Sequence, residues 1–350
     1  MRATKKEMPI QQAIRHLEKY LGIFIHEISK TQREIRQRLY KEVILGILQS
    51  GSTRISKIAG HIKDGCRYYH SREKRLSYEL QEGKWSYEES KKDIHKKISE
   101  TGFITDDTII ALDFTDIEKR NGKVFEHLEK VHDGSTGKTV KGYWMVIIEA
   151  IKHKGEHVPL YMQMFSTAAK GFKSMNAEVY KGVLEIVNSF GRLGWWVMDR
   201  GFDSHQHFIF FIKQELRFII RGYHNRNVET SEGEIKNINT IVKEAHLPGH
   251  HPFFHYYVLS KRGNRSKWEK RGSKVTYGYV RVRVANDSVC GVPCGAEKAG
   301  LTVVIFEGVG AKEKRSYFYT NYPVNSLSDC LAIGKRYGLR WGCEEERSGL

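Results

Sequence analysis

The sequence predicts an α/β protein in which a mixed sheet is flanked by helices, and three observations support this prediction. Compact apolar runs of strand length recur after residue 105; they lie at 107–114, 143–152, 157–166, 194–202 and 217–223. Amphipathic stretches of helical length separate the last three of these runs. A further segment, 225–325, alternates apolar and polar residues between Gly- and Lys-rich turns, which indicates a β-rich insertion. Helices that alternate with strands cover a central sheet.

Length and composition are those of a globular chain. The 350 residues are 40% hydrophobic and 28% charged, which is enough to bury a sizeable core. No apolar run approaches the roughly 18 residues that a membrane span needs, and the N-terminal stretch lacks the apolar segment of a secretory signal. The five cysteines are odd in number and scattered, which suits a reducing compartment. We therefore expect a cytoplasmic protein without membrane contact.

The net charge is the most informative bulk property. The chain carries 58 Lys and Arg against 41 Asp and Glu, a formal charge of +17, and its pI is near 9.5. The basic residues recur along the whole chain rather than in one tail. A polyanion, usually nucleic acid, is the simplest partner for such a chain. A ribosomal or membrane-surface protein can have the same charge, so this alternative stays open.

Residues 1–104 are expected to form a helical DNA-binding region. Apolar residues at helical spacing cover 8–50, and Gly51 ends the second helix. Ser52 or Thr53 is expected to cap a short helix that follows. The basic, aromatic-interleaved stretch CRYYHSREKR comes next, which is typical of a helix-turn-helix region that binds DNA. A generic helical hairpin is the alternative.

Two other motifs are weaker signals. The stretch HDGSTGKT at 132–139 has only two residues between Gly134 and Gly137, whereas a phosphate-binding loop needs four, and it follows a polar segment rather than a strand. We interpret it as a turn between strands. Cys290 and Cys294 form a lone pair without partners at zinc spacing, so we interpret them as buried or loop thiols rather than as a zinc site.

Two aspartates stand at the ends of apolar strands. Asp113 ends IIALD and Asp199 ends WWVMD, where β-branched or apolar residues are expected to continue. A buried carboxylate is costly unless it is paired or binds a metal. Each Asp taken singly fits a cap on the next turn, and this alternative stays open. Two strands of one sheet that end in the same way favour a shared cation site instead.

A site made of oxygen ligands favours a hard cation, Mg²⁺ or Mn²⁺. Two such ions roughly 3.5–4 Å apart activate an attacking oxygen and stabilise the leaving oxygen of a phosphodiester. A third carboxylate usually completes the site, and Glu344 is the candidate. Tyr337, Arg340 and Glu344 are spaced by three and four residues, so they share one helix face, where Tyr337 and Arg340 can reach phosphate. A solvated, charged helix end is the alternative.

Together these residues resemble the DDE transposases of bacterial insertion sequences, in the branch called the insertion-sequence-four family. That branch carries a Tyr-x2-Arg-x3-Glu-x6-Lys signature, and YGLRWGCE supplies Tyr337, Arg340 and Glu344 in register. Asp113 in LDFTD and Asp199 in DRGFDS match the two aspartates of the family. Asp199 follows Asp113 by 86 residues and Glu344 follows Asp199 by 145, which leaves room for the β-rich insertion of this branch. The similarity covers roughly residues 105–350.

The resemblance implies a ribonuclease-H-like core that binds two Mg²⁺ (or Mn²⁺) ions through Asp113, Asp199 and Glu344. It implies cleavage at transposon ends followed by strand transfer into target DNA, with Tyr337 and Arg340 holding the DNA backbone near the cut. The partners would be the terminal inverted repeats and target DNA, bound by a homodimer, with the cytoplasmic protein nucleoid-associated while on DNA. The expected domains after residue 104 are a first part of the catalytic core, the β-rich insertion and a C-terminal core helix, at 105–224, 225–325 and 326–350.

The signature lysine would fall at position 351, directly after Leu350, so we expect the chain to be truncated at its C-terminus. Two other functions stay open beside active transposition. One is a ribonuclease-H-like nuclease that cuts DNA without joining it. The other is a catalytically impaired remnant that only binds the ends of the element.

Overall fold

The computed structural model describes residues 10–29, 32–62, 68–82, 87–119, 125–133, 137–152, 156–223, 225–262, 265–284, 300–308 and 315–347. Within these ranges only the backbone is described at 10–18, 87, 133, 252–262, 265–273, 284 and 341–347. The chain divides into two compact units, Met1–Gly102 and Phe103–Leu350.

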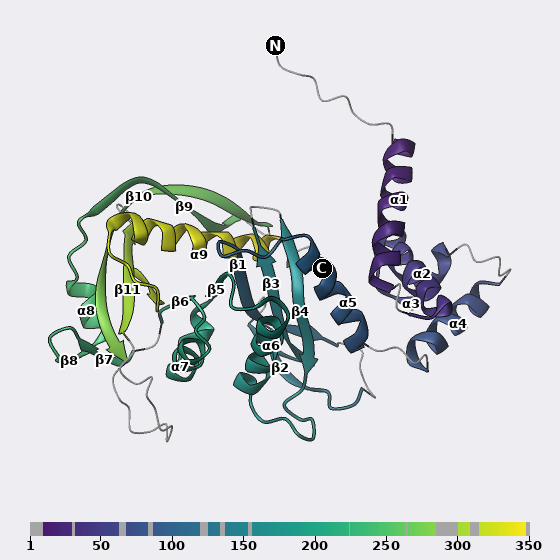
Figure 1. Cartoon of the computed structure of the whole chain (residues 1–350), viewed down its shortest axis with the longest axis horizontal. Coiled ribbons are helices and arrows are strands. Elements are labelled where there is room, and N and C mark those ends of the chain that lie inside the picture. Colours follow the sequence, from purple (N-terminus) through teal and green to yellow (C-terminus); the bar gives the residue numbers. More distant parts are fainter. Residues whose placement is uncertain are drawn as a thin grey trace, which may run out of the picture. The chain divides into compact units, whose positions relative to one another are not determined.

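The first unit is helical (Figure 1). Its helices are α1 (Ile10–Ser29), α2 (Glu34–Ser50), α3 (Ile55–His61), α4 (Tyr69–Gln81) and α5 (Tyr87–Glu100). An apolar core joins α2, α3 and α4; it consists of Leu39, Ile58, Ala59, Ile62 and Leu76. Helices α2 and α3 approach closely, because a Cβ atom added at Gly46 would lie 2.5 Å from Ile58 Cγ2.

The ends of α2 and α3 test two expectations. Helix α2 ends at Gly51, whose φ of 61° lies in the left-handed region that favours glycine, as predicted. The predicted cap of the next helix is wrong, because Arg54 occupies the N-cap position and its side chain makes no capping bond. The Ser52 hydroxyl instead accepts a hydrogen bond from Arg54 N at 3.2 Å, so it stabilises the turn before the helix.

The second unit begins with a mixed sheet. Its first strands are β1 (Ile109–Glu118), β2 (Glu129–Asp133), β3 (Lys138–Ile151), β4 (His157–Phe165), β5 (Trp195–Met198) and β6 (Phe218–Arg221). Strand β3 pairs antiparallel with both β1 and β4, whereas β5 runs parallel to β1 and β6 runs parallel to β5. Helices α6 (Met175–Phe190) and α7 (His205–Lys213) precede β5 and β6. The order β4-β3-β1-β5-β6 with these directions confirms a ribonuclease-H-like mixed sheet flanked by helices.

The β-rich segment extends this same sheet. It contains β7 (Asn227–Thr230), β8 (Ile235–Asn237), α8 (Ile238–Glu244), β9 (Gly249–Arg262), β10 (Arg265–Val284), β11 (Gly300–Gly308) and β12 (Ser316–Thr320). Strand β12 pairs antiparallel with β6, with Tyr319 opposite Ile220, and the sheet continues through β11 and β10 to β7. Backbone hydrogen bonds therefore link the β-rich segment to the core strands.

Helices cover both faces of the core strands, which explains why those strands are apolar on both sides. On one face, α9 (Leu327–Arg347) packs through Ile333 and Tyr337 into a cluster that includes Ala111 and Val197. On the other face, Phe211 of α7 lies against Trp196, with ring centroids 5.6 Å apart. In Figure 1, α9 runs along one side of the sheet and α6 and α7 lie on the other.

Helix α6 adds a close contact to the second face. A Cβ atom added at Gly182 would lie 2.7 Å from the Tyr161 ring of β4 and 3.1 Å from Ile148 of β3. Glycine at this position therefore lets the helix backbone rest directly on the sheet. Among the described residues, no helix is both long and apolar enough to span a bilayer.

Gly182→Ala should destabilise the protein by about 1–3 kcal/mol, because the added methyl group overpacks the contact with Tyr161. The matched control is Gly338→Ala in α9, where nothing lies within 4 Å of the added atom. Alanine has the better helix propensity, so this control should stabilise by up to about 1 kcal/mol. Urea unfolding followed by circular dichroism measures both variants, and equal stabilities would contradict the close packing of α6.

Candidate active site

Asp113 and Asp199 lie side by side on neighbouring strands. The last residues paired between the parallel strands β1 and β5 are Leu112 and Met198, and each aspartate follows directly. Asp199 keeps an extended backbone, with φ −79° and ψ −175°. Neighbouring strands lie about 4.8 Å apart, so this register brings the two carboxylates together. The structure thus places both predicted aspartates at one point of the sheet.

The pleat of the strands decides which face the carboxylates occupy. Side chains alternate along a strand, and Ala111 and Val197, two residues before the aspartates, both pack in the cluster under α9. Asp113 and Asp199 are therefore on the face that α9 covers. An ion pair between Asp113 and Arg340 of α9 confirms this placement for Asp113.

Asp113 is held by its own strand and by α9. Its Oδ1 accepts a hydrogen bond from Phe114 N at 2.8 Å, and its Oδ2 lies 3.4 Å from Arg340 Nη1. The Asp113 side chain is 20% exposed and the Arg340 side chain 5%. A largely buried carboxylate thus has a cationic partner, as its desolvation requires.

Asp199 forms the cap that sequence reasoning kept open as the alternative. It precedes a 3₁₀ turn, η1 (Arg200–Phe202), and its Oδ1 accepts a hydrogen bond from Gly201 N at 2.8 Å. Among the described residues, no hydrogen bond reaches its Oδ2. Capping therefore occupies one carboxylate oxygen and orients the other, so the cap and a cation site are compatible.

Two residues of the α9 signature, Tyr337 and Arg340, are buried rather than solvated. Tyr337 is 5% exposed and packs on the Phe318 ring at 4.5 Å, and burial raises the pKa of its hydroxyl. Arg340 is 4% exposed and its guanidinium lies 5.6 Å from the Tyr337 ring. Glu344 falls four residues later within the same helix, and its side chain lies outside the described residues.

The donor chemistry fits a hard divalent cation. Two carboxylates on adjacent strands offer oxygen ligands, which Mg²⁺ and Mn²⁺ prefer. Among the side chains that the structure describes, no three His, Cys, Asp or Glu residues come together as a metal-binding group. Glu344, the predicted third ligand, lies in the part of α9 where the structure describes the backbone but not the side chains.

An aromatic stack that sequence reasoning missed connects the two aspartates. Phe114 follows Asp113 and stacks on Phe202 of η1, with ring centroids 5.2 Å apart and an interplanar angle of 4°. Phe202 is 1% exposed. The segment that carries Asp199 is therefore fixed to the strand that carries Asp113, through the face of the sheet opposite the carboxylates.

A buried ion pair, also missed, anchors the other end of this segment. Asp203 is 1% exposed; its Oδ2 accepts from Tyr223 N at 2.7 Å and its Oδ1 forms an ion pair with Arg226. Arg226 also donates to Asp203 O at 2.7 Å and lies over the Phe208 ring at 4.9 Å. The signal in the sequence was the second Asp of DRGFDS. The partner of this Asp could not be inferred, because Arg226 lies in another loop, between β6 and β7.

His207 lies beneath the same segment. It is 3% exposed, its ring centroid is 5.5 Å from that of Tyr180 and 5.3 Å from that of Phe202, and burial lowers its pKa to about 4. No described residue forms a hydrogen bond with its Nδ1. His207 is therefore a neutral packing residue at physiological pH.

No family model and no curated protein matches the sequence. Among solved structures, the chain is similar to the piggyBac transposase in a synaptic complex with hairpin DNA, at 10% identity and a TM-score of 0.41, over 99% of this chain and 61% of that chain. It is similar to the NurA nuclease from Sulfolobus solfataricus at 10% identity and a TM-score of 0.31, over 77% of this chain and 82% of that chain. It is similar to the Drosophila P element transposase in a strand transfer complex at 10% identity and a TM-score of 0.21, over 67% of this chain and 55% of that chain. The chain spans less than two thirds of the length of either transposase.

Arg226→Met should destabilise the protein by about 3–5 kcal/mol, because it leaves the Asp203 carboxylate buried without its cationic partner. Arg283→Met is the matched control: Arg283 pairs with Glu229 at 3.3 Å, but its side chain is 51% exposed. Exposed pairs are screened by solvent, so the control should change stability little. Urea unfolding measures both variants, and similar losses in the two would contradict the anchoring role of Asp203.

His207 should make stability fall with acid. Its pKa in the folded protein is about 4, whereas the value for an ordinary histidine is 6.5, so between these pH values only the unfolded chain binds the proton. The free energy of unfolding should therefore lose about 3 kcal/mol through this residue as pH falls from 6.5 to 4. The difference between wild type and His207→Phe across this range isolates the effect. His132→Phe, which replaces an exposed histidine in the same way, is the control. If His207→Phe kept the wild-type dependence of unfolding free energy on pH, the assignment of this dependence to His207 would be refuted.

Proposed function

We propose that this protein is a DNA transposase of the insertion-sequence-four type, which cleaves at transposon ends and joins the freed 3′-hydroxyl to target DNA. One observation carries the proposal: Asp113 and Asp199 follow the last paired residues of two adjacent parallel strands in a ribonuclease-H-like sheet. Both carboxylates lie on the face that α9 covers, and α9 also contains the Tyr-Arg-Glu signature residues.

In this proposal Asp113, Asp199 and Glu344 hold two divalent ions, Mg²⁺ or Mn²⁺. When bound, such ions activate the attacking oxygen and stabilise the leaving oxygen of the phosphodiester. The protein supplies the rest by position: β1 and β5 set the spacing of the aspartates, and the Gly201 N–H orients the Asp199 carboxylate. The Phe114–Phe202 stack keeps the two supporting segments together.

In the proposed site Arg340 has a role besides DNA contact: it compensates the charge of Asp113. Its guanidinium lies beside Asp113 and offsets the repulsion between the two aspartates. A DNA contact by Arg340 requires this guanidinium to exchange the carboxylate for a phosphate, and both are anionic oxygen acceptors that suit arginine. Tyr337, packed under Arg340, would position that group rather than reach DNA through an exposed surface.

The remaining assignments follow from charge and from the division of the chain. With a net charge of +17, DNA is the proposed partner, both as terminal inverted repeats and as target. We assign DNA binding to residues 1–104, catalysis to 105–224 together with 326–350, and the β-rich extension of the sheet to 225–325. A homodimer on DNA is part of the same proposal.

Asp113→Asn and Asp199→Asn should each reduce Mg²⁺-dependent cleavage of DNA to the background rate while DNA affinity stays near the wild-type value. The amide keeps the shape of the side chain but removes the charge that binds a cation. Denaturing gels of end-labelled duplex that contains the sequences flanking the gene measure cleavage, and fluorescence anisotropy measures affinity.

The control for this pair is Asp107→Asn, in the turn that precedes β1. Its carboxylate pairs with Arg336 at 3.2 Å and is 86% exposed, so activity should be retained. Precut ends with a free 3′-hydroxyl then separate two functions: a transposase yields joined products, and a plain nuclease does not. Cleavage that survives in both aspartate variants would refute the assigned site.

A further inference from the structure

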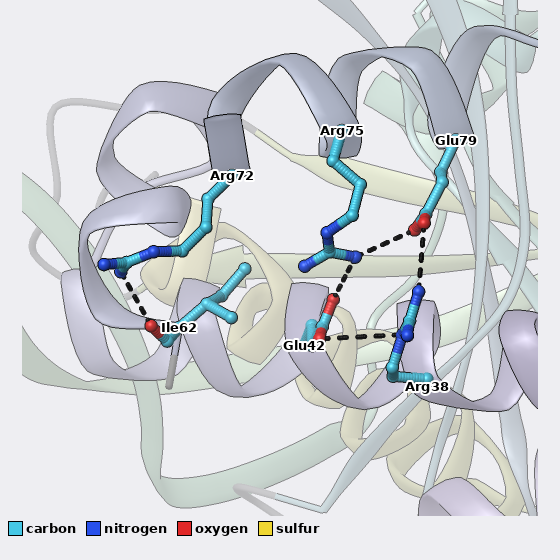
Figure 2. Close-up of polar contacts among 6 residues, drawn as sticks. All are labelled: Arg38, Glu42, Ile62, Arg72, Arg75 and Glu79. Carbon is cyan, nitrogen blue, oxygen red and sulfur yellow. Dashed lines mark hydrogen bonds and ion pairs between the residues drawn. The ribbon is translucent and has the colours of Figure 1, made fainter. Parts of the chain in front are cut away.

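Helix α4 joins the first unit through a network of ion pairs (Figure 2). Arg75 Nη1 lies 2.8 Å from Glu42 Oε2 of α2 and 3.1 Å from Glu79 Oε2 of α4. Arg38 of α2 pairs with the same two carboxylates, with its Nη2 3.2 Å from Glu79 Oε1. These acids are only 11% and 15% exposed. The network thus neutralises them and fixes α4 on α2.

Arg72 serves the same structural purpose toward α3. Its Nη1 donates to Ile62 O at 2.8 Å and to Ala59 O at 3.1 Å, so it satisfies carbonyl groups at the end of α3. The Tyr69 hydroxyl donates to Ser56 O at 2.7 Å and adds a second contact between the two helices. Two arginines of the basic stretch CRYYHSREKR therefore hold the unit together, and they face inward.

The outward face of α4 has a different character. Residues four apart, His70, Lys74 and Tyr78, form an exposed stripe, and Tyr78 is 68% exposed. The other exposed residues of the helix are Tyr69, Ser71, Ser77 and Gln81. Within Tyr69–Gln81 this face contains no carboxylate; Glu73 lies at its margin, 35% exposed, and pairs with His70 at 3.6 Å. The stripe ends at the C-cap of the helix, where Glu82 is exposed. Between Tyr69 and Gln81 the face can donate and accept hydrogen bonds, and Lys74 gives it a positive charge.

The exposed side of α3 continues this pattern. Arg54 and Lys57 are exposed, and the helix contains no acidic residue. An exposed surface of lysine, arginine, tyrosine, serine and glutamine, with its one acid, Glu82, at the far end of α4, suits a polyanion whose phosphates surround readable hydrogen-bonding groups. An α-helix fits the major groove of duplex DNA, which is about 12 Å wide.

We propose that the α3–α4 surface, defined by Arg54, Lys57, His70, Lys74 and Tyr78, is the duplex DNA-binding surface of the first unit. Lys57 and Lys74 contact phosphates, and the outward face of α4 enters the major groove. Arg72 and Arg75, although they lie in the most basic stretch of the unit, contact no DNA. The inference rests on the proposed function for the choice of DNA as the partner.

The test compares Lys57→Ala/Lys74→Ala with Lys92→Ala/Lys96→Ala in the full chain. Lys92 and Lys96 are exposed on α5 of the same unit, so the control removes the same charge elsewhere. Fluorescence anisotropy with a labelled duplex of the gene-flanking sequence and an unrelated duplex, over a KCl series, gives affinity and its salt dependence. Each lost phosphate contact lowers the slope of log K against log salt by about 1.

The α3–α4 variant should lose about tenfold to a hundredfold in affinity for both duplexes at 0.1 M salt, with a slope smaller by about 2. The α5 control should match wild type. Arg75→Met removes one positive charge next to Lys74; it should lower the unfolding midpoint of the protein and leave the salt slope unchanged.

The outcomes separate this inference from the proposed function. If the wild-type chain binds DNA and Lys57→Ala/Lys74→Ala keeps the same affinity and salt slope, the α3–α4 surface does not bind DNA. The transposase proposal would still stand. If only this variant loses DNA affinity but the wild-type chain shows no metal-dependent cleavage, the DNA-binding role of the α3–α4 surface is supported and the transposase proposal is overturned. A smaller salt slope in Arg75→Met would contradict the inward role of that arginine. A wild-type chain that binds neither duplex would overturn both.

Discussion

The parallel pairing of β1 with β5 is the constraint on which the candidate site depends. The pairing joins residues far apart in the chain, and a shift of one residue would turn one aspartate to the opposite face. The register is held by large apolar side chains on both faces: Trp195 and Val197 pack under α9, and Trp196 packs against α7. Stability of the core and geometry of the site are therefore set by the same contacts.

This constraint creates an electrostatic problem. Two carboxylates that follow paired residues of adjacent strands repel each other, and partial burial strengthens this repulsion. Arg340 beside Asp113 and the Gly201 N–H on Asp199 reduce that cost in the structure as it stands. A divalent cation between the carboxylates would replace the repulsion by attraction. The structure thus keeps two like charges close together, and the proposed cation site would account for this arrangement.

The segment from Asp199 to Asp203 shows how the site is made rigid. Asp199 follows a buried strand and caps the 3₁₀ turn, and Phe202 stacks on Phe114. At the far end, the buried Asp203 forms an ion pair with Arg226. A functional carboxylate on an unanchored turn would lose its spacing to Asp113 with each fluctuation. Here the turn is fixed by three independent contacts.

Much of this architecture could be predicted from local pattern. Buried strands such as β5 appear as continuous apolar runs, and Asp113 and Asp199 stand out because each comes at the end of such a run. Strand β2 was missed because EKVHD is polar, and β12 could not be placed beside β6 without knowledge of the pairing. Composition likewise could not tell Arg75, which faces the core of its unit, from Lys74, which faces outward.

The central claim is that Asp113 and Asp199 form a divalent cation site. A crystal structure of the protein soaked in Mn²⁺, with anomalous diffraction recorded at the manganese edge, tests it most directly. The account predicts an anomalous peak in contact with carboxylate oxygens of both Asp113 and Asp199, and no peak there in Asp199→Asn. Mn²⁺ bound elsewhere, with Arg340 still paired to Asp113 and no peak between the aspartates, would contradict it.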